Sequence, residues 1–139
     1  MKIFIDEMAW LALANPSHEL HHQIKEQVKY YLDGGHNFYT TNIIVGNVIS
    51  KIKLEQGHQK AIKYSDILEE AWLGNHLHYL WIGRRTQRDA SKLFRRLTDS
   101  KLTIFDCANI VLMNRRNIRF IMTSNMDYNQ MGFKILPQT

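Results

Sequence analysis

The sequence predicts an α/β fold of three layers, in which helices cover both faces of a central parallel β-sheet. Short apolar segments with strand composition alternate along the chain with longer segments of helical periodicity. Strands that are separated by helices pair in parallel and are covered on both faces. The chain has 139 residues, of which 45% are hydrophobic. This size and composition predict one domain, residues 1–139, with a single sizeable core.

The N-terminal part begins with a buried strand, Lys2–Asp6, which carries Asp6 at its C-terminal end. Met8–Ala14 has the composition of a short apolar helix. A second helix is expected over Ser17–Asp33, because the Ser17 hydroxyl can cap its first turn. Gly34-Gly35 ends it, since glycine readily adopts the left-handed cap conformation. The residues of this helix that are expected to face inward are Leu20, Ile24, Val28, Tyr31 and Leu32.

The middle of the chain is expected to alternate strand, helix, helix, strand and helix. In chain order the segments are Asn37–Thr40, Ile43–Glu55, a helix that follows Gly57-His58 and runs to about Trp72, Leu77–Ile82, and a helix from Thr86 or Gln87 through Leu97. Thr41 or Asn42 is expected to cap the first of these helices. This alternation is typical of a parallel sheet.

The stretch Leu102–Phe133 is predicted to contain a helix, a strand and a polar turn in succession. Thr103 is a natural N-cap for the helix. Asp106 places a negative charge in the first turn, at the positive end of the helix dipole. Asn117 is expected to end the helix. The apolar residues at helical spacing are Ile104, Ala108, Val111 and Leu112.

A strand is predicted at Ile118–Met122, and the polar turn Thr123–Asp127 follows it directly. Lys134–Leu136 is expected to add a last strand. A carboxylate that opens a helix, such as Asp106, and a polar cluster that closes the next strand can share one edge of a parallel sheet. Open α/β proteins bind their ligands at that edge, so the sequence predicts a site there.

The residues of this stretch that form a motif are Asp99, Leu102, Thr103, Asp106 and Cys107, then Thr123, Asn125, Asp127, Tyr128, Gly132 and Phe133. In this order and spacing they resemble the C-terminal half of PIN-domain nucleases, especially VapC-type toxins of toxin–antitoxin pairs. That family has an Asp-(Lys)-x-Leu-Ser-x-x-Asp-Cys/Ala segment, then a strand ending in Thr-x-Asp-x-(His/Asp)-Phe and a later Gly-Phe. The order of elements agrees along nearly the whole chain, so the resemblance implies a PIN-like α/β/α domain.

The resemblance also implies a nuclease site built from four acidic positions that bind Mg²⁺ or Mn²⁺. The first position matches Asp6 and the third matches Asp106, and these two are the expected metal ligands. The second falls on Asn47, within the segment Thr41–Ile49, and the fourth falls on Asn125. All four are candidate catalytic positions, and two of them carry Asn in place of an acid.

The chemistry of the cation decides what this replacement means. Asparagine offers a carbonyl oxygen but no charge, so Asn47 and Asn125 weaken the attraction for a divalent ion and are expected to remove a second-metal position. Mg²⁺ is often held by one or two carboxylates with waters and substrate phosphate, a minimum that Asp6 and Asp106 meet. Asp127 is a poor substitute, because in the family this position is variable and often His.

Seven histidines raise the alternative of a zinc site. His18, His21 and His22 are predicted on one helix, and the spacing of His18 and His22 can chelate Zn²⁺. No third ligand accompanies them, so a solvated helix face is the better interpretation. The single cysteine, Cys107, is expected to be a small buried hydrophobe rather than a nucleophile. One cysteine cannot form an internal disulfide, which suits the cytoplasm.

The net charge of +5 favours an anionic partner. Basic residues concentrate between Arg84 and Arg119, where they can follow a phosphate backbone. RNA, an antitoxin protein and a homodimer partner are implied by the resemblance alone. The apolar side chains that could serve association are Trp10, Leu13, Tyr30 and Trp72, with core packing expected for at least half of them. No apolar run approaches the ~18 residues of a membrane span, and the N-terminus lacks a signal-peptide pattern.

The expected function is that of a VapC-like, metal-dependent endoribonuclease in the cytoplasm, with activity weakened or lost. The alternative is a degenerate, non-catalytic PIN domain that binds RNA or a partner protein. A phosphoacceptor receiver domain also places acids at a sheet edge. It needs an Asp ending the third strand and a Lys after the fifth, which Ile82-Gly83 and Met122-Thr123 do not supply. The sequence leaves open the target RNA, the antitoxin, the oligomeric state and whether catalysis survives.

Overall fold

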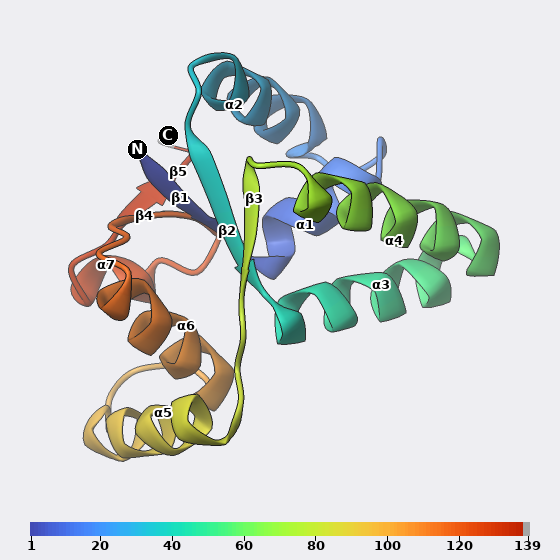
Figure 1. Cartoon of the computed structure of the whole chain (residues 1–139). Helices are drawn as coiled ribbons and strands as arrows, with labels where there is room; N and C mark the ends of the chain where they lie inside the picture. The colour runs from blue at the N-terminus through green and yellow to red at the C-terminus, as the bar shows by residue number, and fades with distance from the viewer. Residues whose placement is uncertain (138–139) are drawn as a thin grey trace.

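The computed structural model describes residues 1–137 and has a five-stranded, entirely parallel sheet between helices (Figure 1). The strands are β1 (Lys2–Ile5), β2 (Asn37–Thr41), β3 (Leu77–Leu80), β4 (Phe120–Met122) and β5 (Lys134–Leu136). The helices are α1 (Glu7–Ala14), α2 (His21–Asp33), α3 (Asn42–Gln56), α4 (His58–Leu73), α5 (Arg84–Arg96), α6 (Ile104–Arg115) and α7 (Asp127–Gln130). In Figure 1, α1, α3 and α4 lie to one side of the strands and α6 and α7 to the other. The predicted three-layer α/β/α architecture is confirmed.

The strand order β3-β2-β1-β4-β5 contains one reversal of direction, between β1 and β4. After β1 the chain builds outward through β2 and β3, and it then returns to add β4 on the other side of β1. Ligands of open α/β sheets bind beyond the carboxyl ends of the strands at such a switch point. Here those ends deliver Asp6 after β1 and Thr123 after β4.

The two strands at the switch point are buried on both faces. Ile3, Phe4 and Ile5 of β1 and Ile121 and Met122 of β4 expose at most 1% of their surface. Their registers pair Phe4 with Ile121 and Ile5 with Met122. Close packing of these side chains holds the two strand ends in a fixed relation, which is what a site made from both requires.

The helix predicted from Ser17 begins four residues later, at His21, so the expected Ser17 cap is wrong. Residues 17–20 instead form local turns. The Asn15 side chain accepts a hydrogen bond from the Ser17 amide at 3.0 Å, and the His18 ring accepts from the Leu20 amide at 3.0 Å. Such side-chain bonds to nearby amides compete with helix formation. His18 therefore lies outside the helix, and the predicted His18/His22 pair on one helix face does not form.

Other element ends differ by a few residues from the prediction. β1 ends at Ile5 and β3 at Leu80, α5 begins at Arg84, and β4 begins at Phe120. The short helix α7 replaces part of the predicted polar turn. The predicted end of α6 at Asn117 is supported, because Asn117 has a φ of 55°, in the left-handed region that asparagine tolerates.

One side chain is placed differently from the expectation, and the two tryptophans named for association differ in exposure. Leu32, predicted to face inward, is 40% exposed. Of the candidates for association, Trp10 has the core role expected for at least half of them: it is buried and donates through its indole nitrogen to the Thr40 hydroxyl at 3.1 Å. Trp72 is about half exposed and stacks on Tyr79, with the ring centroids 4.9 Å apart. Among residues 1–137 no helix has the length and apolar character needed to traverse a membrane.

Candidate functional site

Asp6 stands at the junction of β1 and α1 and serves both as the end of the strand and as the cap of the helix. Its Oδ1 accepts a hydrogen bond from the Glu7 amide at 2.8 Å, which caps α1. Its Oδ2 accepts from the hydroxyl of Thr123 at 2.7 Å. The Asp6 amide donates to the carbonyl of Met122 at 3.0 Å. Backbone and side chain together therefore fix this carboxylate between β1 and β4.

The electrostatic environment of Asp6 favours its neutral form. Burial raises the pKa of Asp6, and the negative charge of Asp106 raises it further, while the hydrogen bonds from Thr123 and Glu7 oppose the shift. A cation bound beside these two carboxylates would compensate their negative charge.

Asp106 approaches the same place from α6. It forms a capping box with Thr103, in which the Asp106 amide donates to the Thr103 hydroxyl at 3.1 Å and Oδ2 of Asp106 accepts from the Thr103 amide at 2.9 Å. The reciprocal pair satisfies two amides that a helix start leaves without partners. The cap thus determines the direction in which the acid projects from the helix.

Tyr128 connects this acid to the core. Its hydroxyl donates to Oδ1 of Asp106 at 2.9 Å and accepts from Nδ2 of Asn109 at 3.1 Å. The ring is fully buried and meets Phe133 edge to face. Burial raises the pKa of Tyr128, and the charges of Asp6 and Asp106 add to the shift. The phenol therefore stays protonated and donates to the carboxylate.

The loop after β4 brings Asn125 to the site through Thr123. The Asn125 amide donates to the Thr123 hydroxyl at 3.1 Å, and Oδ1 of Asn125 accepts from the Asp127 amide at 3.1 Å. Asp127 points elsewhere, because its Oδ2 accepts from the Lys101 amide at 3.0 Å. It braces the loop before α6, which agrees with the expectation that Asp127 does not replace the missing acid.

Asn47 reaches the neighbourhood from α3 and is exposed. One turn later on the same helix, Lys51 forms an ion pair with Glu7, the residue that follows Asp6. Residues four apart share a helix face, so Asn47 lies on the side of α3 that faces the start of α1. Within residues 1–137 no hydrogen bond joins Asn47 to the other three predicted positions. The hydrogen bonds thus link Asp6 and Asn125 through Thr123. Asp106 forms a second set with Thr103 and Tyr128, and its negative charge acts on Asp6.

The donor set suits one divalent cation and not two. No three histidine, cysteine, aspartate or glutamate side chains gather as a metal site in the part of the chain that the structure describes. The two carboxylates can nevertheless bind an oxygen-seeking cation, because each oxygen accepts a single protein hydrogen bond and keeps a lone pair. Hard ions such as Mg²⁺ take one or two carboxylates and complete their shell with water and phosphate.

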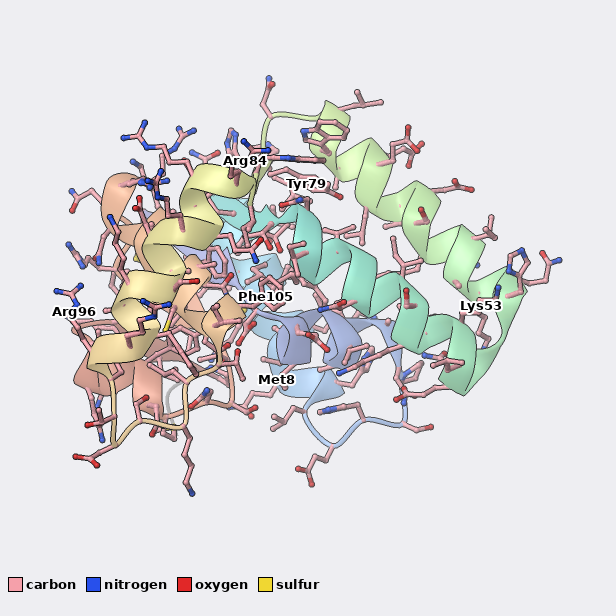
Figure 2. All side chains as sticks on the ribbon, turned by 90° about the horizontal axis from the view of Figure 1, so that it is seen from below. Met8, Lys53, Tyr79, Arg84, Arg96 and Phe105 are labelled. Carbon is pink, nitrogen blue, oxygen red and sulfur yellow. The ribbon has the colours of Figure 1, made fainter. Side chains whose placement is uncertain are left out.

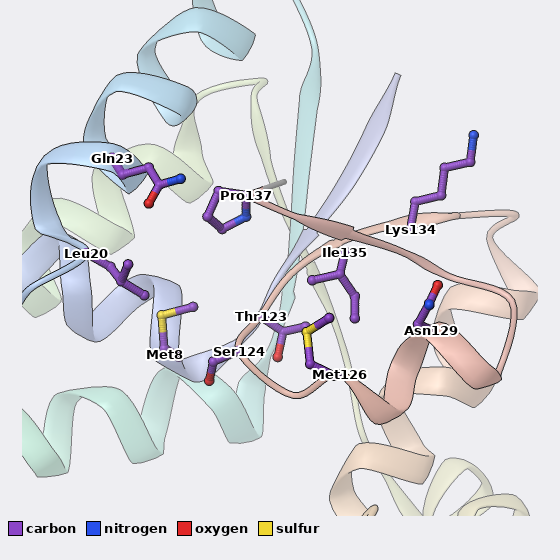
Figure 3. A pocket seen from close by; sticks show the side chains of 10 residues that line it. All are labelled: Met8, Leu20, Gln23, Thr123, Ser124, Met126, Asn129, Lys134, Ile135 and Pro137. Carbon is purple, nitrogen blue, oxygen red and sulfur yellow. The ribbon is translucent and has the colours of Figure 1, made fainter. Parts of the chain in front are cut away.

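A cavity of about 610 Å³ opens next to the loop that follows β4 (Figure 3). Its walls are mostly apolar, with Met8 and Leu20 on one side and Met126 and Ile135 on the other, and Thr123 lies between them. Neither Asp6 nor Asp106 lines it. Thr123 therefore contacts Asp6 and also lines this cavity.

Six of the basic residues found between Arg84 and Arg119 form one face of α5. Figure 2 shows Arg84 and Arg96 at the two ends of this helix and side-chain nitrogens gathered along its outer side. Its basic residues are all exposed: Arg84, Arg85, Arg88, Lys92, Arg95 and Arg96. Its one acid, Asp89, pairs with Arg115 of α6. The positive charge of α5 is therefore uncompensated along its outer face.

Three residues that matter to the geometry were missed as site residues by sequence reasoning: Thr123, Tyr128 and Asn109. Thr123 and Tyr128 had been noted only as parts of the motif. A signal was present, because Tyr128 stands where the family pattern has Phe and so adds a hydroxyl at a position that packs in the core. Asn109, in the middle of an apolar helix face, is the second such signal.

Comparison with known proteins gives two findings. The sequence pattern of the PIN domain matches residues 3–134. The fold is similar to the crystal structure of VapC20 from Mycobacterium tuberculosis, described as a toxin that cleaves the sarcin–ricin loop. The TM-score is 0.78 at 19% sequence identity, and the similarity covers 95% of this chain and 96% of that chain. No curated protein sequence matches the chain.

Proposed function

Because the chain belongs to the PIN domain family, we propose that it is a VapC-like endoribonuclease that uses one Mg²⁺ or Mn²⁺ held by Asp6 and Asp106. The observation that carries the proposal is the convergence of these two carboxylates at the switch point of the sheet, where the charge of Asp106 adds to the raised pKa of Asp6. A cation compensates this charge, and RNA supplies the phosphate that completes its ligand shell.

The bound ion would activate water for attack on phosphorus and offset the negative charge that develops on the phosphate. The protein's own part is to hold the two acids. Thr123 and the Glu7 amide keep the carboxylate of Asp6 from rotating, and Thr103 does the same for one oxygen of Asp106. Asn125 is linked to Thr123 through its backbone amide, and its side chain accepts from the Asp127 amide.

The expected activity is low. Asn47 and Asn125 contribute no charge, so a divalent ion meets two carboxylates rather than four. Cation affinity depends strongly on the number of charged ligands. The absence of a third acidic ligand within residues 1–137 leaves room for a single ion. We therefore expect cleavage to require Mn²⁺ on the order of millimolar rather than micromolar.

RNA as the substrate is supported by charge and by family. The outer face of α5 carries six basic residues, and two of them lower the stability of the helix. Arg84 and Arg85 stand in the first turn, where positive charge opposes the helix dipole, and Gly83 provides no side-chain cap. A helix that keeps such residues against its own stability is suited to bind a polyanion. The cleavage of RNA by VapC20 makes RNA the preferred polyanion.

A second function has a specific observation in its favour. The Asn125 side chain accepts from the Asp127 amide, and the Asp127 carboxylate accepts from the Lys101 amide. These side chains therefore stabilise the loop and are not free to bind a metal ion. This favours a non-catalytic domain that binds RNA through α5 or binds a partner protein. Under either function we propose an antitoxin and a second copy of the chain as partners, in the cytoplasm, with Tyr30 and Trp72 exposed for such contacts.

The deciding experiment titrates Mn²⁺ into the pure protein with a labelled RNA and follows cleavage, with EDTA as the baseline. The Asp106→Asn variant is prepared in parallel, and Asp66→Asn, an exposed acid on α4, is the matched control. The nuclease proposal expects Mn²⁺-dependent cleavage that Asp106→Asn removes and Asp66→Asn keeps. Cleavage that persists in Asp106→Asn indicates a contaminating nuclease. RNA binding without any cleavage favours the non-catalytic domain.

A further inference from the structure

The hydroxyl of Tyr128 lies in an environment that packing alone does not require. The Tyr128 side chain exposes none of its surface, and its ring fills the core against Phe133. A phenylalanine would supply the same ring contacts. A buried hydroxyl is costly unless it is hydrogen-bonded, so its presence calls for partners.

The hydroxyl has two hydrogen-bond partners, and one of them, Asn109, has a buried polar atom of its own without a partner. The hydroxyl donates to Asp106 at 2.9 Å and accepts from Asn109 at 3.1 Å. Asn109 is itself only 3% exposed, and its Oδ1 has no hydrogen-bond partner within residues 1–137. Buried polar atoms without partners are rare and need an explanation. Here the explanation is the other end of the same amide, which orients the Tyr128 hydroxyl.

The consequence falls on the carboxylate of Asp106. Its Oδ2 accepts from the Thr103 amide and its Oδ1 from Tyr128, so both oxygens are held at once. Rotation of the carboxylate would break both hydrogen bonds. Thr103 acts from the start of α6, and Tyr128 acts from α7, an element that is remote in sequence. The orientation of Asp106 is thus fixed from two independent directions.

We propose that Tyr128, oriented by Asn109, is a positioning residue that sets the carboxylate of Asp106 for a divalent cation. This inference rests on the proposed nuclease function. In a site with two carboxylates the direction of each one matters, because no further acid can compensate for a misplaced ligand. Hydrogen-bond partners of metal ligands typically change metal affinity by about 10- to 100-fold when they are removed.

The test measures Mn²⁺ affinity directly, by calorimetric titration without RNA. Tyr128→Phe removes only the hydroxyl and is expected to bind Mn²⁺ about 10- to 100-fold more weakly. Tyr64→Phe is the matched control, because the Tyr64 hydroxyl is also partly buried and donates to the Trp10 carbonyl at 3.2 Å, away from the acids. It is expected to retain the affinity of the unaltered protein. In cleavage assays, Tyr128→Phe should need more Mn²⁺ but recover most of its maximal rate at saturation.

The outcomes separate this inference from the function beneath it. Failure of the unaltered protein to bind Mn²⁺ overturns the nuclease proposal and this inference with it. Binding by the unaltered protein and by Tyr128→Phe with equal affinity overturns the positioning role alone, as does an equal loss in Tyr64→Phe. If Tyr128→Phe does not fold, Asn109→Ala serves instead. It keeps the phenol but removes the donor that orients it, and unchanged Mn²⁺ affinity there also overturns the proposal.

Discussion

Asp6 and Thr123 are 117 residues apart in the chain, yet the Thr123 hydroxyl donates to Oδ2 of Asp6 at 2.7 Å. The bond spans the switch point of the sheet and continues a line of backbone hydrogen bonds from the Asp6 amide to Met122 and from the Thr123 amide to Leu136. The site therefore exists only when β4 has docked between β1 and β5. Its two carboxylates come from opposite halves of the chain, so they meet only when both halves have folded.

The raised pKa of Asp6 predicts a stability that depends on pH. Burial, with Asp106 adding to it, raises the pKa of Asp6 above its ordinary value of 3.8, so the folded protein binds this proton more readily than the unfolded chain does. Folding stability linked to Asp6 is therefore lost as the pH rises from about 4 through the folded pKa. Asp6→Asn removes the penalty and should melt a few degrees higher than the unaltered protein at neutral pH without metal.

This difference should shrink as the pH falls through the folded pKa of Asp6 and vanish only below its ordinary value of 3.8, where the carboxyl is protonated in both states. Thermal unfolding in EDTA across that range measures it, and Asp66→Asn, which changes an exposed acid, controls for the loss of one negative charge. A variant Asp6→Asn that is less stable at neutral pH would mean that the hydrogen bonds from Glu7 and Thr123 outweigh burial.

The Tyr128–Asn109 pair predicts a non-additive effect on stability. Tyr128→Phe leaves Nδ2 of Asn109 buried without its partner, beside an Oδ1 that already has none. An unsatisfied buried polar group costs about 1–3 kcal/mol, whereas replacing both partners by apolar groups can be nearly neutral. Tyr128→Phe should therefore be destabilising, and adding Asn109→Leu should recover most of the loss.

Urea unfolding of the two single variants and the double variant, without metal, completes this cycle. Equal and additive losses would show that the two side chains contribute independently. The cycle is separate from the Mn²⁺ titration, because stability can recover in the double variant while the orientation of Asp106 does not.

The fold was predictable because it follows from local patterns, whereas the choice of Asp6 and Asp106 as site residues came from the resemblance to the family. The alternation of strand-like and helix-like segments predicted the parallel sheet. Thr103 predicted a helix start, which in the structure is a capping box formed with Asp106. The start of α2 was not predictable in the same way. Ser17 was expected to cap the helix, but the Asn15 side chain accepts from the Ser17 amide and the His18 ring accepts from the Leu20 amide. Two equally plausible local hydrogen-bond patterns were available, and tertiary packing selected one.

The network behind the site lay beyond sequence reasoning for a different reason. The Tyr128 hydroxyl meets Asp106 and Asn109 from 22 and 19 residues away. Helical periodicity shows that Asn109 lies on the buried face of α6, but it does not show what lies opposite. Only the docking of α7 against α6 supplies the partner. A residue whose role depends on a hydrogen bond between two helices is therefore identified only in the three-dimensional structure.

The basic face of α5 predicts a salt-dependent affinity for RNA. Arg88 and Arg95 are exposed on its outer side, and replacing both by Gln should weaken binding and lower the slope of log affinity against log salt. Each lost phosphate contact should reduce that slope by about 0.7 for a single strand. Fluorescence anisotropy with a short RNA in EDTA measures binding without cleavage.

The matched control replaces Lys60 and Lys63 by Gln. Both are exposed on α4, so the net charge changes equally while α5 stays intact. An equal effect of both pairs would mean that RNA responds to the total charge of the protein, and the α5 face would lose its special role.

The last prediction concerns the two neutral positions of the site. Asn47→Glu with Asn125→Asp should raise Mn²⁺ affinity and RNA cleavage together, because each new carboxylate adds a full charge near the cation. Even at an effective dielectric of ~20 such a charge contributes on the order of several kcal/mol before desolvation. Part of the gain is lost to repulsion from Asp6 and Asp106 without metal. The double variant should therefore melt lower in EDTA than the unaltered protein and gain more from added Mn²⁺.

The control for this restoration is Asn75→Asp, an exposed position just before β3 at the opposite edge of the sheet. It adds negative charge far from Asp6 and should change neither Mn²⁺ affinity nor cleavage. If Asn47→Glu with Asn125→Asp lowers stability in EDTA but gains nothing from Mn²⁺, the added acids repel without forming a ligand shell. The hydrogen bond from the Asp127 amide to Asn125 gives a physical reason for that result, since it holds the side chain of residue 125 in the loop. Such an outcome would favour the non-catalytic domain, because the carboxylates at positions 47 and 125 would then be present but not placed to bind the cation.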